Sequence, residues 1–330
     1  MRCVAVFILL LGGSTLVGCA GGTASRSTSG GVEVSPADRV RAGELLREAG
    51  QLDAALQQFN RALLDNPRSV DAVLGIGSVE HARLQYERAR DTYRRAVGMD
   101  ATRFEPRYYL GLMQQVLGET GEAINEYRIA LQLNPDDPNT HRDLATAYLQ
   151  VGRPDLALSH AERAVELEPG SQAAWCNLAA TYSLLGRYED ALRGYRTATE
   201  IDELDAPVLL GLGDTHLKLE NFPRAVNTLA ELVRRFPGSV AHERLGYALF
   251  RTYAFERSQW HYRRALAYNP EEVTALNGLG ATLVTEYMRQ DNRRRKAKLD
   301  EALDAWRRSL RLSPDQPRIA DLVSRYGRLE

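Results

Sequence analysis

The stretch WCNLAATYSLLGRYEDALRGYRTA, residues 175–198, decides the fold. Small residues stand at Ala179 and Ala191, the bulky Tyr195 follows, and Gly186 lies between two segments whose apolar residues have helical spacing. Two helices approach closely only where the facing side chains are small, and a ring on one helix then fills the groove of its neighbour. Glycine suits the point where the first helix ends. The stretch therefore predicts two packed helices joined by a turn at Gly186.

The same pattern recurs with a period of 34 residues. Prolines at multiples of this period close the second helix, because the residue before a proline disfavours the α conformation. These prolines are Pro67, Pro135, Pro169 and Pro237, followed one residue early by Pro270. A small residue recurs in the first helix as Gly43, Gly77, Gly111, Ala145, Ala179, Gly213, Gly246 and Gly280. A large residue recurs in the second as Phe59, Tyr93, Tyr127, Tyr195, Leu229, Tyr262 and Trp306, and repeat four has Ala161 instead.

This pattern resembles the tetratricopeptide repeat (TPR), and the resemblance covers residues 36–314. It implies an all-α solenoid of about eight helix-turn-helix repeats that wind into a right-handed superhelix. Pro314 follows Pro270 by 44 residues instead of 34, so the last repeat contains an insertion. Residues 315–330 are expected to form a C-terminal capping helix, with one apolar face made of Ile319, Leu322, Val323 and Tyr326.

The amino terminus has the layout of an export signal. Arg2 precedes an apolar run, residues 4–11, that is too short to span a bilayer. Residues 16–19, LVGC, resemble a bacterial lipobox, which implies a signal peptide at 1–18, cleavage after Gly18 and lipidation of Cys19. A Gly/Ser/Thr-rich tether extends to residue 35. Ala20 after the cysteine favours an outer-membrane lipoprotein that faces the periplasm; the alternative is an ordinary signal peptide with an incidental cysteine.

Composition narrows the function classes. The 330 residues are 44% hydrophobic and 26% charged with a net charge of −1, which is typical of a globular protein and gives no drive toward nucleic acid. Only Cys19 and Cys176 would remain after cleavage, so a disulfide framework is not expected. Phosphate-binding loops, nucleophile elbows and zinc motifs are missing, and the six histidines are scattered through the repeats. We therefore expect no enzymatic activity, no cofactor and no metal site.

The resemblance implies that the first helix of each repeat lines a concave groove. Such a mixed wall of aromatic, aliphatic and polar groups suits an extended peptide or a partner helix. It lacks the Lys/Asn/Arg set of carboxylate-clamp TPR proteins, and each residue could instead serve packing between repeats. The expected groove residues are Tyr108, Leu112, Gln115, Asn139, Arg142, Thr146, Leu149, Cys176, Ala180, Ser183, Leu210, Asp214, Lys218, Glu243, Tyr247, Phe250 and Arg251.

The insertion in repeat eight, residues 288–300, is strongly basic. One interpretation is a contact with anionic lipid headgroups, a polyanionic envelope polymer or an acidic partner. The other is a solvated loop or helix extension. Its cations are Arg289, Arg293, Arg294, Arg295, Lys296 and Lys298, against Asp291 and Asp300.

Together these features predict a non-catalytic scaffold that is lipid-anchored in the bacterial envelope and holds other envelope proteins in its groove. The chain looks like the lipoproteins that pilot secretin rings for type IV pili, or that assist tight-adherence pilus and exopolysaccharide machines. The alternative is an adaptor that recruits peptidoglycan-remodelling enzymes. An enzyme with its site in the groove is the third hypothesis.

Overall fold

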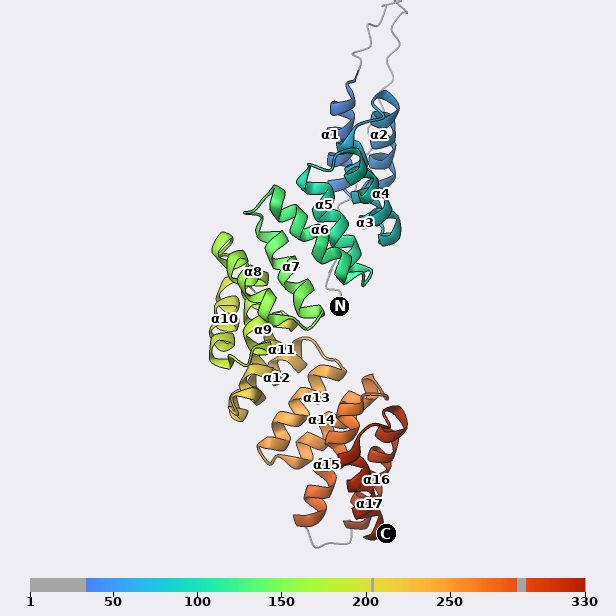
Figure 1. Cartoon of the computed structure of the whole chain (residues 1–330). Helices are drawn as coiled ribbons and strands as arrows, with labels where there is room; N and C mark the ends of the chain where they lie inside the picture. The colour runs from blue at the N-terminus through green and yellow to red at the C-terminus, as the bar shows by residue number, and fades with distance from the viewer. Residues whose placement is uncertain (1–33, 203–204, 290–294, 330) are drawn as a thin grey trace, which may run out of the picture.

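The computed structural model describes residues 34–202, 205–289 and 295–329. The predicted signal peptide, Cys19, most of the tether, Arg293 and Arg294 lie outside the described residues. The described part of the chain contains 17 α-helices, a short 3-10 helix at Gly327–Leu329 and no strand (Figure 1). This confirms the all-α prediction.

Sixteen of these helices form eight consecutive hairpins, and α17 closes the array. The hairpins are α1 (Pro36–Glu48) with α2 (Leu52–Asp65), α3 (Val70–Ala82) with α4 (Tyr86–Met99), α5 (Phe104–Val116) with α6 (Thr120–Leu133), α7 (Pro138–Gln150) with α8 (Pro154–Leu167), α9 (Gln172–Leu184) with α10 (Tyr188–Ile201), α11 (Ala206–Lys218) with α12 (Phe222–Arg235), α13 (Ser239–Arg251) with α14 (Phe255–Tyr268), and α15 (Val273–Arg289) with α16 (Arg295–Leu312), followed by α17 (Pro317–Tyr326).

Local chemistry starts and stops the helices. Ser69, Ser171 and Asp205 cap their helices, because each side chain accepts a hydrogen bond from the backbone N–H three residues on. Four hairpins turn through a glycine with positive φ, namely Gly50, Gly118, Gly152 and Gly186. Repeats two, six and seven place Leu84, Glu220 and Tyr253 in the same conformation, with φ of 61°, 55° and 61°. The turn geometry is therefore common to repeats one to seven even where glycine is absent.

The small and large positions meet as the sequence predicts. A Cβ atom added at Gly43 would lie 2.7 Å from the Phe59 ring, and one added at Gly77 would lie 2.6 Å from the Tyr93 ring. Gly75, Gly211 and Gly278, each in the first helix of the following repeat, leave room for the rings of Phe59, Tyr195 and Tyr262. Phe59 and Tyr262 thus sit between the first helix of their own repeat and that of the next. In repeat four, Tyr148, Trp175 and Tyr182 pack against the cluster that contains Ala161.

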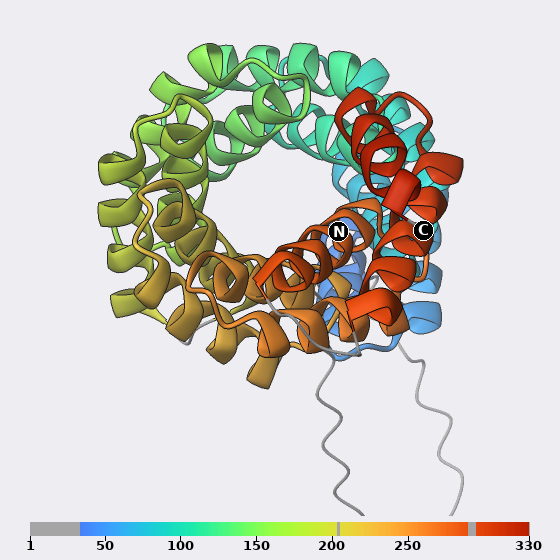
Figure 2. The same ribbon diagram turned by 90° about the horizontal axis from the view of Figure 1, so that it is seen from below.

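The hairpins stack into a superhelix whose path forms a ring when it is viewed along its axis (Figure 2). First helices of successive repeats contact one another, as α5 does with α7, α7 with α9 and α11 with α13, and second helices chiefly contact first helices. The first helices therefore form the inner, concave face. The amino-terminal and carboxy-terminal repeats lie at opposite ends of the array (Figure 1).

Repeat eight differs from the other repeats. Its helices α15 and α16 have 17 and 18 residues, against 13 and 14 in the first and second helices of the other repeats, so the insertion lengthens both. α17 covers the open end: Ile319, Leu322, Val323 and Tyr326 pack against the cluster that contains the buried Trp306. A capping helix is thus present, with the apolar face that the sequence predicts.

Candidate functional site

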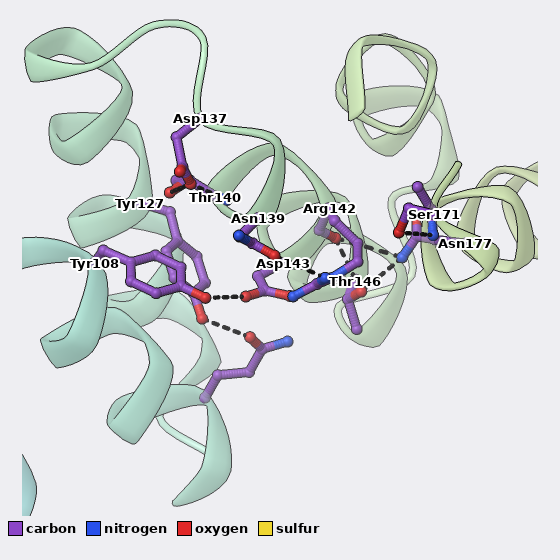
Figure 3. A network of polar contacts seen from close by, with 12 residues as sticks. Tyr108, Tyr127, Asp137, Asn139, Thr140, Arg142, Asp143, Thr146, Ser171 and Asn177 are labelled. Carbon is purple, nitrogen blue, oxygen red and sulfur yellow. Dashed lines mark hydrogen bonds and ion pairs between the residues drawn. The ribbon is translucent and has the colours of Figure 1, made fainter. Parts of the chain in front are cut away.

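A polar network crosses the concave face from α5 to α9 (Figure 3). The Tyr108 hydroxyl donates to Asp143 Oδ2 at 3.0 Å, and Arg142 Nε donates to Asp143 Oδ1 at 3.0 Å. Arg142 also donates to Asn139 Oδ1 at 2.9 Å. Tyr127 donates its hydroxyl hydrogen to Gln115 Oε1 at 2.8 Å. These bonds hold the side chains of repeats three and four in one fixed arrangement.

Asp143 is the central acceptor of this network. Its side chain is 13% exposed, and burial raises its pKa, against the opposing effect of Arg142 and the Tyr108 hydroxyl. Burial, and then the charge of Asp143, raises the pKa of Tyr108, so its hydroxyl stays a donor at neutral pH. The network therefore fixes the Arg142 guanidinium on the wall of the groove.

The network continues to α9 through Asn177. The Asn177 amide donates to Thr146 Oγ1 at 2.6 Å, and Thr146 in turn donates to the Arg142 carbonyl at 3.0 Å. Asn177 Oδ1 is buried and accepts no hydrogen bond from any described residue. A hollow of about 370 Å³ lies at this point, lined by Arg142, Thr146, Asn177 and Tyr195 among others. The rest of the Asn177 side chain lines this hollow, whereas its Oδ1 is covered by the surrounding protein.

A second cluster lies on α11 and α13. Arg244 Nε pairs with Asp214 Oδ1 at 2.9 Å and also pairs with Glu243, and burial raises the pKa of both carboxyls. These three residues line a second hollow, also of about 370 Å³, together with Lys218 and Tyr247.

Arg251 fixes Tyr247 in this second cluster. It donates to the Tyr247 hydroxyl at 3.0 Å and lies 4.1 Å above the centre of the Phe222 ring. Phe250, one residue earlier, is partly buried, and its ring centre lies 5.9 Å from that of Phe255.

Many of the expected groove residues therefore fall into two clusters. Tyr108, Asn139, Arg142 and Thr146 meet in the first, and Asp214, Lys218, Tyr247 and Arg251 meet in the second. Leu112 instead packs against the core cluster of Tyr93 and Leu110. That these residues bind a partner stays a prediction.

Sequence reasoning missed Asp143, Asn177 and Arg244. Asp143 and Arg244 each follow an expected groove residue directly in the sequence. Asn177 donates to Thr146, which lies 31 residues earlier in the chain on another helix. It also missed a hollow of about 630 Å³ on α1, α3 and α5. The stacked Tyr93 and Tyr109 rings, 5.3 Å apart, contribute to its wall.

Two of the described cations of the insertion, Lys298 and Arg289, make contacts within the molecule. Lys298 Nζ pairs with the buried Glu286 at 2.5 Å. The Arg289 guanidinium lies 5.7 Å from the Tyr253 ring centre and 5.4 Å from that of Phe255. Lys296 is exposed, and Arg295 begins α16.

The described residues show no group of three or more histidine, cysteine, aspartate or glutamate side chains that could hold a metal ion. In the same residues, none of the helices combines the length and the apolar character needed to span a membrane. Cys176 is a free thiol whose pKa burial raises to about 12, so it behaves as a small apolar side chain in the groove wall.

Known families match more than half of the chain. Models described as tetratricopeptide repeat match residues 40–106, 138–181 and 185–245, and one described as TPR repeat matches residues 116–152. The CTR9 homolog of Arabidopsis thaliana is 35% identical over 106 residues, which are 31% of this chain. The chain spans only 9% of the length of the curated relatives it matches.

Solved structures share the fold. The APC/C hetero-tetramer Cut9–Hcn1 superposes with a TM-score of 0.64 and 16% identity, over 91% of this chain and 57% of that one. Pseudomonas aeruginosa pilF superposes with a TM-score of 0.57 and 21% identity, over 62% of this chain and 94% of that one. At these identities the likeness concerns the fold alone.

Proposed function

The chain is a tetratricopeptide repeat protein, and we propose on that premise that it is a non-catalytic scaffold that holds an extended segment of a partner protein along its concave face. The TPR fold itself implies an interaction scaffold. The observation that carries the proposal is the ordered row of polar groups on α5, α7, α9, α11 and α13. These groups are fixed by neighbours, so little side-chain entropy is lost when a partner binds.

The middle of the groove suits a main chain. The Asn177 side chain lines the hollow at this point while its Oδ1 is covered by the protein, so an extended segment would pack against the exposed atoms of this side chain. Arg142 and Asn139 beside it offer a donor and an acceptor to side chains of the segment. The hollow next to Asn177 would hold one of these side chains.

We propose that the scaffold is anchored through Cys19 in the bacterial envelope, on the periplasmic face of the outer membrane. The support is the LVGC stretch behind an apolar run and the Ala20 that follows it. Each buried CH₂ of a lipid chain contributes about 0.8 kcal/mol, and several chains on one residue make a stable anchor. In cells, Cys19→Ser should no longer incorporate a palmitate analogue; continued labelling of this variant would contradict the anchor.

Within the envelope we propose a role in the assembly of a pilus, secretin or exopolysaccharide machine, and the alternative is recruitment of peptidoglycan-remodelling enzymes. The basic insertion is proposed as an additional contact to an anionic surface through Lys296 and the cations beside it. Deleting residues 289–298 should then weaken binding to vesicles that contain anionic lipid. An enzyme in the groove remains the third hypothesis, tested by a turnover assay on groove variants.

Site-specific photocross-linking tests the groove. A photoreactive amino acid at Asn139, exposed on the first helix α7, should capture the partner in intact cells. The same residue at Glu166, exposed on the second helix α8, is the matched control and should capture much less. Captured secretin or pilin supports the assembly role, and captured hydrolases support the adaptor role. Equal capture at both positions would contradict the groove.

A further inference from the structure

Two histidine pairs occupy the same positions in repeats four and seven. His141 Nδ1 on α7 faces His160 Nδ1 on α8 at 3.0 Å, and His242 Nδ1 on α13 faces His261 Nδ1 on α14 at 2.9 Å. The two members are 19 residues apart in each pair. Each pair therefore joins the first helix of its hairpin to the second.

The hydrogen bonds of the first pair define its protonation. His141 Nε2 lies 2.9 Å from the Pro135 carbonyl oxygen, which can only accept, so the hydrogen of His141 is on Nε2. His141 Nδ1 is then the acceptor, and His160 Nδ1–H is the donor. When both rings are protonated, two N–H groups face each other through the Nδ1 atoms, and the bond between the helices is lost.

The surroundings of both pairs are cationic or aromatic. In addition to burial, the charge of Arg128 on α6 lowers the pKa of His160. The Tyr148 ring of α7 stacks on the His160 ring, with 5.9 Å between the ring centres. In addition to burial, the charges of two arginines on α14 lower the pKa values of the second pair, Arg257 that of His261 and Arg264 that of His242. The Tyr268 ring stacks on the His242 ring, with 5.7 Å between the ring centres. None of these groups compensates an added positive charge.

Burial, then the partner histidine, then the nearby arginine lower the pKa of His160 and His261 to about 4. In the unfolded chain both would titrate near pH 6.5. A group whose folded pKa is lowered contributes stability that is complete above its unfolded pKa. That stability is lost as the pH falls from about 6.5 toward 4.

Repeat three provides an internal contrast at the same two positions. There Arg107 Nη1 pairs with Glu126 Oε2 at 2.9 Å, with side chains that are 15% and 18% exposed. Opposite charges replace the two imidazoles, and the arginine stays charged throughout the range in which the histidines titrate. The hairpin of repeat three therefore lacks the acid sensitivity of repeats four and seven.

Both pairs lie directly beside the groove clusters. His141 precedes Arg142 and Asp143, and His242 precedes Glu243 and Arg244. We propose that the two histidine pairs are acid-sensitive contacts that hold together the hairpins α7–α8 and α13–α14. Acidification then loosens α7 and α13, which line the groove, and releases the bound segment. The release rests on the proposed function; the loosening does not.

Hydrogen exchange of the full-length protein at pH 7.5 and pH 5.0, corrected for intrinsic rates and measured with and without EDTA, tests whether the two hairpins loosen in acid. Opening of α7–α8 and α13–α14 should increase roughly tenfold or more at pH 5.0 relative to α5–α6. Equal changes in all three hairpins would overturn the proposal. Loss of the acid response on adding EDTA would also overturn it, because the pairs would then act through a bound metal ion.

Replacing each histidine pair by the Arg–Glu pair that repeat three has at these positions provides the matched variant. The double changes His141→Arg with His160→Glu, and His242→Arg with His261→Glu, should abolish the acid response of their own hairpins only. His160→Asn and His261→Asn, which place an amide opposite the partner histidine, should reduce the acid response and serve if the Arg–Glu variants fail to fold. An unchanged acid response in folded variants would overturn the proposal. No partner enters these measurements, so their failure would leave the groove to be judged by cross-linking at Asn139.

Discussion

The packing between helices and the concave face follow opposite rules in this molecule. Between helices nearly every repeat uses the same solution, a buried large residue such as Phe59 or Tyr93 against a glycine. On the concave face each repeat differs, with Tyr108 in repeat three, Arg142 in repeat four and Asp214 in repeat six. The repeated positions build the solenoid, and the positions that do not repeat are free to specify a partner.

Removing one of the buried rings should have the largest effect on the stability of the protein. Phe59→Ala deletes a fully buried side chain between Gly43 and Gly75, and we expect a loss of about 3–5 kcal/mol in the free energy of unfolding. Leu64→Ala on the same helix removes a side chain that is 82% exposed and should change it by less than about 0.5 kcal/mol. Denaturant titration of both variants checks this, and similar losses would contradict the packing described here.

Adding a methyl group should have the next largest effect. Gly211→Ala puts a Cβ into the space of the Tyr195 ring, and we expect a loss of about 1–3 kcal/mol. Gly98→Ala, inside α4, meets nothing within 4 Å and should instead stabilise the protein by about 0.5–1 kcal/mol. Melting temperatures that move in opposite directions are the expected result; a fall in both would show that the two glycines have the same role.

A change on the concave face should separate binding from stability. Asn177→Ala removes the unsatisfied Oδ1 and the bond to Thr146, so the free energy of unfolding should change by no more than about 1 kcal/mol. Affinity for the partner captured at Asn139 should fall about fivefold or more, because a side chain that lines the hollow is lost. Unchanged affinity in a titration of the purified pair would exclude Asn177 from the binding site.

The smallest expected effect concerns the turns. Leu84 adopts a positive φ of 61° where other repeats have glycine, and its side chain is 59% exposed. Leu84→Gly should relieve the strain and stabilise the protein by about 0.5–1 kcal/mol. Gly118→Ala, at φ 82°, is the reverse change and should destabilise by a similar amount. Thermal unfolding should show a higher melting temperature for Leu84→Gly and a lower one for Gly118→Ala. Shifts in the same direction would mean that the two turns are not equivalent.

The period of the sequence predicts the core because every core contact repeats it. Rings, facing glycines, glycine turns and the apolar face of α17 could all be placed without coordinates. The concave contacts could not, because they join residues of different repeats, as Tyr108 does with Asp143, through the curvature of the stack. The same holds for Lys298, whose pairing with Glu286 depends on how far α15 and α16 extend.

The histidine pairs are an intermediate case. Their equal spacing of 19 residues, at one position in repeats four and seven, is visible in the sequence once the repeats are aligned. Taken one at a time, the histidines look scattered. That the two rings face each other through Nδ1 follows only from the packing of α7 on α8 and of α13 on α14.

The central claim is that the concave face, and not the outer face, holds the partner. Hydrogen exchange of the protein with and without the partner captured at Asn139 tests it most directly. The account predicts slower exchange in the first helices α5, α7, α9 and α13 and little change in the second helices α6, α8 and α14. Protection confined to the second helices would contradict it.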